Sequence, residues 1–304
     1  MSLDRMIENI RRTGNPTVAG LDPKLSYIPS YIRKKAFAEY GETLDGAAAA
    51  ILTYNKALID ALCDIVPAVK PQAAYYEMYG WQGMKTLTET IAYAKEKGMF
   101  VITDGKRNDI GTTMEAYATA HLGKTAVGEQ QFSAFGGDAL TVNGYLGSDG
   151  IRPLLGVCRE MDGGIFVLVK TSNPSSGELQ DQLLGDKTVY RTMGDNCEKW
   201  GEELPGKYGY SGVGAVVGAT YPSQLSELRE ALPHTYFLVP GYGAQGGGAK
   251  DVAGAFDRDG LGAIVNSSRG ILCAWQKENC AEEDFAGAAR REALRMKEDI
   301  TSVL

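Results

Sequence analysis

The feature that most constrains the fold is a regular alternation of short apolar segments with longer segments of helical character along the chain. The apolar segments are nearly continuous, for example TVAGL at 17–21, FVIT at 100–103 and GIFVLVK at 164–170. Strands buried on both faces have this composition, and their alternation with helices is typical of a parallel sheet. The chain contains about eight such strand-then-helix units, the number that closes a (β/α)₈ barrel.

A single α/β domain with the TIM-barrel fold fits this pattern better than two dinucleotide-binding domains. The length of 304 residues suits one barrel, and no linker or low-complexity stretch divides the chain. The G-x-G-x-x-G fingerprint of dinucleotide-binding folds does not follow the first strand. We expect residues 1–304 to form one domain, with terminal helices at about 3–12 and about 282–304 and a mostly helical segment at about 179–203.

Composition argues against several classes of protein. The net charge of -7 disfavours nucleic acid as the main partner, so any anionic substrate needs a local group of cations. No apolar run approaches the ~20 residues of a membrane span, and the N-terminus lacks the apolar core of a signal peptide. The five cysteines are scattered without metal-type spacing. We therefore expect reduced thiols in a cytoplasmic protein that does not associate with membranes.

Polar residues follow most of the predicted strands at their carboxyl ends, which meet at one mouth in a barrel. Asp104 and Lys106 share one face of a strand because strand side chains alternate, and Asp109 follows in the turn before a helix. A lone Asp-x-Lys pair is most simply a surface ion pair. A series of polar strand ends favours an active site instead. The series comprises Asp22, Lys70, Asp104, Lys106, Asn143, Ser172 and Arg269.

The last two predicted strands carry a second signal. The segment GYGAQGGG at 241–248 has five glycines in eight residues, and glycines leave backbone N–H groups open to an anion. Arg269 follows the next strand and can bind phosphate through two hydrogen bonds. Because barrel phosphate sites often use the loops after strands seven and eight, the pattern favours a phosphate site over a flexible surface loop.

Together these residues carry a family resemblance. DGKRNDIGTT at 104–113 resembles the D-x-K-x-x-D-I-x-x-T motif of the orotidine 5'-phosphate decarboxylase family. Further segments resemble the longer bacterial-type branch of that family, in order and on the expected strands. They are AGLDP at 19–23, VKPQAAYYE at 69–77, TVNGYLGSD at 141–149, VKTSNPSSG at 169–177, VPGYGAQGG at 239–247 and NSSRGI at 266–271. The resemblance implies a TIM-barrel homodimer, no cofactor and conversion of orotidine 5'-phosphate to UMP and carbon dioxide.

The resemblance also implies catalytic roles. Lys70, Asp104, Lys106 and an Asp109 from the partner subunit would form an array of alternating charge. Asp104 would lie against the substrate carboxylate, and Lys106 would protonate ring carbon 6. Without an organic electron sink, such an array must stabilise the carbanion electrostatically, and no metal is expected.

Binding roles follow in the same way. Asp22 and Lys70 would bind ribose hydroxyls, and Ser172 the pyrimidine ring. Gln245 and Arg269 would bind the phosphate, and Thr113 would reach the partner's site. Asn143 and Pro240 are further substrate-binding candidates at strand ends. One departure is Ser268, where the commoner short form has glycine before the arginine.

Three alternatives stay open on the sequence alone. Sugar-phosphate relatives of the same barrel, such as 3-keto-gulonate-6-phosphate decarboxylase, use magnesium and an acidic residue where this chain has Lys70. A Schiff-base aldolase and a catalytically silent nucleotide-binding protein are the others. His121 and His234 fall outside the strand ends, and Tyr75 and Tyr76 are expected to pack in the core.

Overall fold

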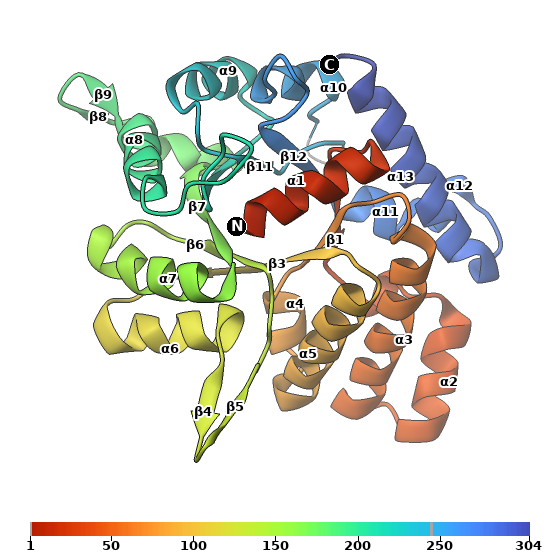
Figure 1. Ribbon diagram of the computed structural model, residues 1–304. Coiled ribbons are helices and arrows are strands. Elements are labelled where there is room, and N and C mark those ends of the chain that lie inside the picture. Colours follow the sequence, from red (N-terminus) through yellow and green to blue (C-terminus); the bar gives the residue numbers. More distant parts are fainter. Residues whose placement is uncertain (1, 244–245) are drawn as a thin grey trace.

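The barrel expected from the sequence is confirmed. The computed structural model describes residues 2–243 and 246–304, and in them eight parallel strands close in the order β1-β12-β11-β10-β7-β6-β3-β2. Helices surround the barrel on its outside (Figure 1). The barrel strands are β1 (Thr17–Leu21), β2 (Ala68–Pro71), β3 (Phe100–Arg107), β6 (Ala139–Val142), β7 (Gly164–Lys170), β10 (Val213–Val217), β11 (Phe237–Val239) and β12 (Ala263–Ser267).

The helices follow the strands as the alternating pattern predicts. The C-terminal helix begins after a 3₁₀ turn at Glu282–Asp284, slightly later than expected. The helices are α1 (Ser2–Thr13), α2 (Ser30–Tyr40), α3 (Leu44–Leu62), α4 (Ala74–Glu77), α5 (Gly80–Glu96), α6 (Gly111–Leu122), α7 (Ser148–Met161), α8 (Val189–Gly201), α9 (Pro222–Ala231), α10 (Ala249–Val252), α11 (Arg269–Leu272), α12 (Ala274–Glu278) and α13 (Phe285–Thr301).

The barrel interior is a packed apolar layer that is closed at one end by α1. Side chains such as Ile102, Phe166 and Ile264 point inward and join Met6 and Ile7 of α1 in one buried cluster. Figure 1 shows α1 lying across the barrel, at the end where the strands begin. The opposite end, where the strands finish, therefore holds the mouth of the barrel.

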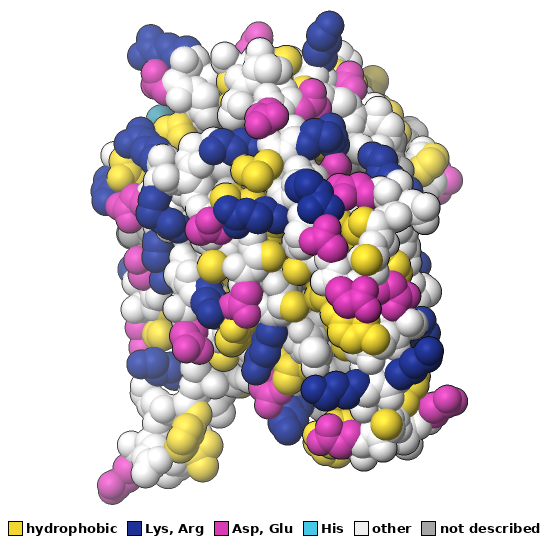
Figure 2. All heavy atoms as spheres, turned by 90° about the vertical axis from the view of Figure 1, so that its right-hand side faces the viewer, with side chains coloured by type: hydrophobic (Ala, Val, Ile, Leu, Met, Phe, Trp, Pro, Cys, Tyr) yellow, Lys and Arg dark blue, Asp and Glu magenta, His cyan; other side chains and the backbone are white. Residues whose placement is uncertain are grey.

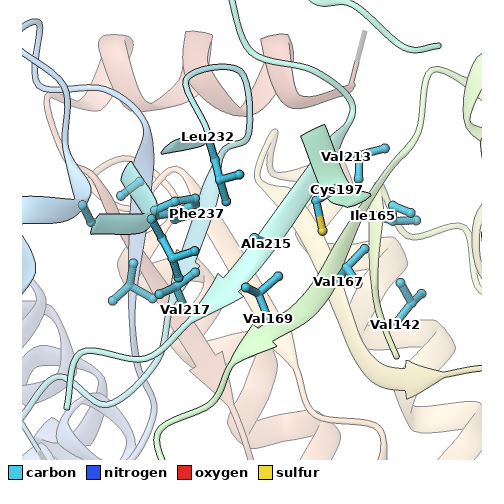
Figure 3. Packing of buried hydrophobic residues seen from close by; sticks show 14 of the residues in the cluster. Val142, Ile165, Val167, Val169, Cys197, Val213, Ala215, Val217, Leu232 and Phe237 are labelled. Atoms are coloured by element: carbon cyan, nitrogen blue, oxygen red, sulfur yellow. The ribbon is translucent and has the colours of Figure 1, made fainter. Parts of the chain in front are cut away.

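The outer faces of the strands pack against the helices. Val167 on β7 and Ala215 on β10 belong to a second buried cluster that includes Cys197 of α8 (Figure 3). Their neighbours along the chain, such as Phe166, face the interior because side chains alternate. Burial of both faces is the physical reason that these strands are nearly continuous apolar runs.

Two hairpins were not predicted. Residues 179–203 were expected to be mostly helical, but a hairpin of β8 (Leu183–Leu184) and β9 (Lys187–Thr188) precedes α8. Gly185 adopts a φ of 71° in its turn, which glycine does at little cost. A second hairpin, β4 (Thr125–Val127) with β5 (Gln130–Phe132), projects from the barrel (Figure 1).

The surface carries both signs of charge. Figure 2 shows acidic and basic side chains mixed over one face, with small apolar areas between them. Among the described residues, no helix combines the length and the apolar character needed to cross a lipid bilayer.

One buried histidine couples folding to pH. His121 in the last turn of α6 is 3% exposed, and its ring stacks on Phe135 at 4.8 Å. Its Nδ1 has no hydrogen-bond partner among the residues described. Burial, with a smaller contribution from Arg107, lowers the pKa of His121 to about 4.

We predict that His121→Leu removes part of the acid sensitivity of the fold. The unfolded histidine takes up a proton near pH 6.5, whereas the folded one does so only near pH 4. Between these values protonation stabilises the unfolded state, so the free energy of unfolding decreases as the pH falls. Between pH 7 and pH 5 the wild type should lose about 2 kcal/mol more unfolding free energy than the variant. Urea denaturation at the two pH values measures this. An equal loss of unfolding free energy in the variant and the wild type would contradict the prediction.

Candidate active site

Three charged side chains meet at the mouth of the barrel. Lys70 Nζ lies 2.7 Å from Asp104 Oδ2, and Lys106 Nζ lies 2.6 Å from Asp104 Oδ1. The side chains of Lys70 and Asp104 are only 6% and 9% exposed, whereas that of Lys106 is 45% exposed. The carboxylate is thus held between a buried ammonium and one that faces the solvent.

Lys70 and Asp104 reach this position by strand alternation. Ala68 and Ile102 belong to the inward-facing layer, and residues two positions further along each strand face inward as well. The position of Lys106 does not follow from regular strand alternation, which was the expectation from the sequence. Lys106 has a φ of 47°, and the pairing of β3 with β6 shifts register between Thr103 and Arg107. An irregularity within β3, rather than regular alternation, therefore returns its ammonium to Asp104.

Both buried groups are stabilised in their charged forms. Burial by itself raises the pKa of Asp104, but Lys70 and Lys106 together outweigh it and hold that pKa well below its usual range. Burial likewise opposes the charge on Lys70, yet Asp104 and Asp22 raise the pKa of Lys70 above its ordinary value. At neutral pH the two side chains form an ion pair.

A cavity of about 390 Å³ opens beside this ion pair. Five residues expected from the sequence line it, namely Asp22, Lys70, Asp104, Pro240 and Arg269. Gly241 and Tyr242 of the glycine-rich segment and Ser268 line it too, together with four residues for which no binding role was predicted: Lys24, Tyr27, Tyr75 and Asn266. Tyr76 is buried in the core as expected, and Tyr75 packs against the same cluster while also lining the cavity.

Two acceptor atoms beside the cavity are buried without a partner. Asp22 Oδ1 and Asn266 Oδ1 have no hydrogen bond in the part of the chain that the structure describes. An unsatisfied buried acceptor is costly, so both atoms are suited to receive hydroxyl or amino groups of a ligand.

One part of the cavity wall is formed by β12 and by the segments that follow β11 and β12. Gly241 and Gly243 have φ values of 105° and 72°, and Arg269 begins α11. Ser268 also explains a glycine in the AGLDP segment, because a Cβ on Gly20 would lie 1.9 Å from Ser268 Oγ. Gln245, predicted to bind phosphate, lies outside the described residues.

Three other predicted residues lie away from this cavity in the single chain. Ser172 lines a neighbouring cavity of about 510 Å³ together with Tyr221. Asn143 is exposed, and its Oδ1 accepts the N–H of Tyr145 in a turn. Thr113 is exposed on α6.

Asp109 is also separate from the charged group in the single chain. Its Oδ1 accepts the N–H of Ile110 at the start of α6. Among the described residues, no ion pair joins Asp109 to Lys106 of the same chain.

The loop that carries Ser172 is anchored by a buried lysine that sequence reasoning missed. Lys170, at the end of β7, has a fully buried side chain whose Nζ lies 2.7 Å from Asp181 Oδ1. It also donates a hydrogen bond to Ser176 Oγ at 3.1 Å and lies over the ring of Tyr221. These contacts hold the loop after β7 on the barrel. The sequence did contain a signal for this role, because Lys170 ends an otherwise apolar strand.

Comparison with known proteins agrees with this geometry. A sequence model of the orotidine 5'-phosphate decarboxylase / HUMPS family matches residues 47–283. The chain belongs to this family. A protein named orotidine 5'-phosphate decarboxylase from Rhodopirellula baltica is 46% identical to it over 295 residues, covering 96% of each chain. One of the same name from Caldicellulosiruptor bescii is 40% identical over 301 residues, covering 99% of this chain and 98% of the relative.

Solved structures of the orotidine 5'-phosphate decarboxylase family have the same fold. The structure of Leishmania donovani OMP decarboxylase superposes with a TM-score of 0.76 at 30% identity, covering 99% of this chain and 98% of the other. The family resemblance read from the sequence motifs is thereby confirmed. Among the described residues of this family member, no group of three or more His, Cys, Asp or Glu side chains could hold a metal ion.

We predict that Asp104→Asn destabilises the fold. The substitution removes the carboxylate that is hydrogen-bonded to the buried Lys70 ammonium, and breaking a buried pair from one side costs about 3–5 kcal/mol. Urea denaturation at pH 7 measures the change in unfolding free energy. Asp186→Asn, at an exposed aspartate in the β8–β9 hairpin, is the control and should change it by less than about 0.5 kcal/mol. Equal stability of the two variants would contradict the description of Asp104 as a buried counter-ion.

Proposed function

We propose that this chain decarboxylates orotidine 5'-phosphate to UMP and carbon dioxide, the last step of UMP synthesis, without a cofactor. The observation that carries this proposal is the Lys70–Asp104–Lys106 group beside a cavity whose other end has Arg269. Membership of the family and relatives named for this activity support the same reaction.

The proposed chemistry breaks the bond between ring carbon 6 and the carboxylate. The electron pair stays on carbon 6 in the plane of the ring, where the π system cannot delocalise it. Fixed charges at the site stabilise this carbanion electrostatically, without reorganisation at the moment of reaction. Lys106 then donates a proton to carbon 6, and its 2.6 Å contact with Asp104 Oδ1 is consistent with a charged ammonium.

The proposed binding mode uses the length of the cavity. Arg269 and Gln245 hold the phosphate, while Asp22 and Lys70 bind the ribose hydroxyls. The unpartnered Asp22 Oδ1 supports this assignment, since a ribose hydroxyl would satisfy it. Phosphate binding remote from the reacting carbon can drive loop closure and exclude water.

Pyrimidine contacts come from the rim. Ser172 hydrogen-bonds the ring, and Pro240 and Asn143 complete the substrate-binding set. Asn143 lies on an exposed turn outside the main cavity of the single chain, so we expect this turn to move toward the substrate on binding.

We further propose a homodimer in which Asp109 and Thr113 complete the partner's site. In its own chain Asp109 is bound only to the backbone N–H of Ile110 among the contacts of the described residues. Ile110 and Tyr117 beside it are 51% and 36% exposed, which leaves apolar surface for a second copy. The five free cysteines support a cytoplasmic location for this enzyme.

A magnesium-dependent sugar-phosphate reaction is the main competing function. It requires an acidic ligand at the second-strand position, where this chain has Lys70 buried against Asp104. A buried ammonium repels a divalent cation, so the residues present do not suit that metal site.

We expect the purified protein to decarboxylate orotidine 5'-phosphate, with or without EDTA, in an assay that follows the loss of substrate absorbance. Lys106→Ala should lower kcat by about 10³-fold or more, because the proton donor is removed. Its circular dichroism spectrum and dimer mass serve as the control for folding. A wild type without turnover would refute the function, and activity lost in EDTA would revive the metal-dependent alternative.

Shared sites predict complementation between two inactive variants. Asp109→Ala and Lys106→Ala should each be inactive alone. After mixing, dissociation and reassembly, half of the dimers are hybrids with one intact site, so activity should recover to about a quarter of the wild type. Lys106→Ala taken alone through the same dissociation and reassembly is the control, because no intact site can form in its dimers. Recovery in the control, or none in the first mixture, would contradict the shared-site arrangement.

A further inference from the structure

Thr141 makes two hydrogen bonds at the centre of the charged group, yet it neither lines the cavity nor takes part in the proposed chemistry. It lies on β6, two residues beyond the inward-facing Ala139, and is 1% exposed. Its hydroxyl donates to Asp104 Oδ1 at 2.8 Å and accepts the backbone N–H of Lys106 at 3.0 Å. The hydroxyl therefore donates one hydrogen bond to the charged group and accepts another from it.

The backbone that Thr141 contacts is in an unusual conformation. Lys106 has a φ of 47°, and the only other described non-glycine residues with positive φ are Asp162 and Asn279. Those two end helices, and Asp and Asn tolerate this conformation better than most residues. Lysine has no such preference, so the conformation at Lys106 must be held by its surroundings.

The register shift between β3 and β6 explains what the hydroxyl does. Regular pairing ends at Thr103 opposite Leu140 and resumes at Arg107 opposite Val142. The N–H of Lys106 falls in this irregular stretch, where regular strand pairing does not supply its hydrogen-bond partner. Thr141 Oγ1 supplies it, in place of a carbonyl of the neighbouring strand.

We infer that Thr141 is a positioning residue for the proton donor. Its hydroxyl holds Lys106 in the bent backbone conformation that directs Nζ back to Asp104, and at the same time fixes the plane of the Asp104 carboxylate. Asp104 then has a donor from each of Lys70, Lys106 and Thr141, so its orientation is fully determined. The loss of kcat expected below rests on the proposed function, whereas the expected change in the geometry of Lys106 does not.

A purely structural role would not require the hydroxyl. The position faces the barrel interior, and the inward position two residues earlier is occupied by an apolar alanine. Valine has nearly the shape of threonine and would fill the same space without the two hydrogen bonds. Thr141→Val therefore separates positioning from packing, and Thr141→Ser restores the hydroxyl without the methyl group.

Thr103→Val is the matched control. Thr103 is a fully buried threonine on β3, next to Asp104 in sequence, but its Oγ1 has no hydrogen-bond partner among the described residues. Replacing that hydroxyl removes no contact with the charged group. The control therefore measures the general effect of a threonine-to-valine change at this end of the barrel.

Kinetics give the first test. Thr141→Val should lower kcat by about 10- to 100-fold, as expected for loss of hydrogen bonds to a charged group, with KM within about twofold. Thr141→Ser and Thr103→Val should stay within about threefold of the wild-type kcat. A wild-type kcat in Thr141→Val, or an equal loss in Thr141→Ser, would overturn the inference.

Crystal structures of the wild type and Thr141→Val give a second test that does not depend on the reaction. The variant should lose the positive φ at Lys106, and its Nζ should leave Asp104. If Lys106 keeps its geometry in the variant, the inference is wrong whether or not the protein is active. If the wild type does not turn over orotidine 5'-phosphate, the proposed function fails, and the structures alone decide the role of Thr141.

Discussion

The buried ion pair between Lys70 and Asp104 is the interaction on which the site depends. Each side chain is less than a tenth exposed, and either charge alone would cost several kcal/mol at this depth. The two strands that carry them pair in parallel, with Ala68 opposite Phe100 and Gln72 opposite Asp104. Lys70 is therefore offset from Asp104 along the strand direction, and its long side chain spans the offset.

The barrel gives this pair its environment. Apolar side chains fill the interior beneath it, and α1 closes the far end, so the charges face solvent only through the mouth. A low local dielectric strengthens every electrostatic interaction in such a place. The same packing that stabilises the barrel thus makes the charges effective in the proposed reaction, where fixed charges act on a developing carbanion.

The binding of phosphate and ribose that we propose would depend on a different part of the fold. Gly20 on β1 lies so close to Ser268 that no larger residue fits, and this contact joins the first and last barrel strands at the mouth. Asp22 and Arg269 follow those two strands and line one cavity. Closure of the barrel therefore brings residues from the beginning and the end of the chain to the same cavity.

Much of this could be predicted from the sequence. The alternation of strands and helices, the polar residues at strand ends and the glycine-rich segment are local patterns, and they are sufficient to predict the barrel and to select Lys70, Asp104 and Arg269. The hairpin at 183–188 was missed because its Gly185 turn interrupts a segment of otherwise helical composition. The bend at Lys106, its hydrogen bond to Thr141 and the positions of Tyr75 and Asn266 were decided only by the tertiary structure. They depend on the register between strands that are distant in sequence and on closure of the barrel, which no local periodicity encodes.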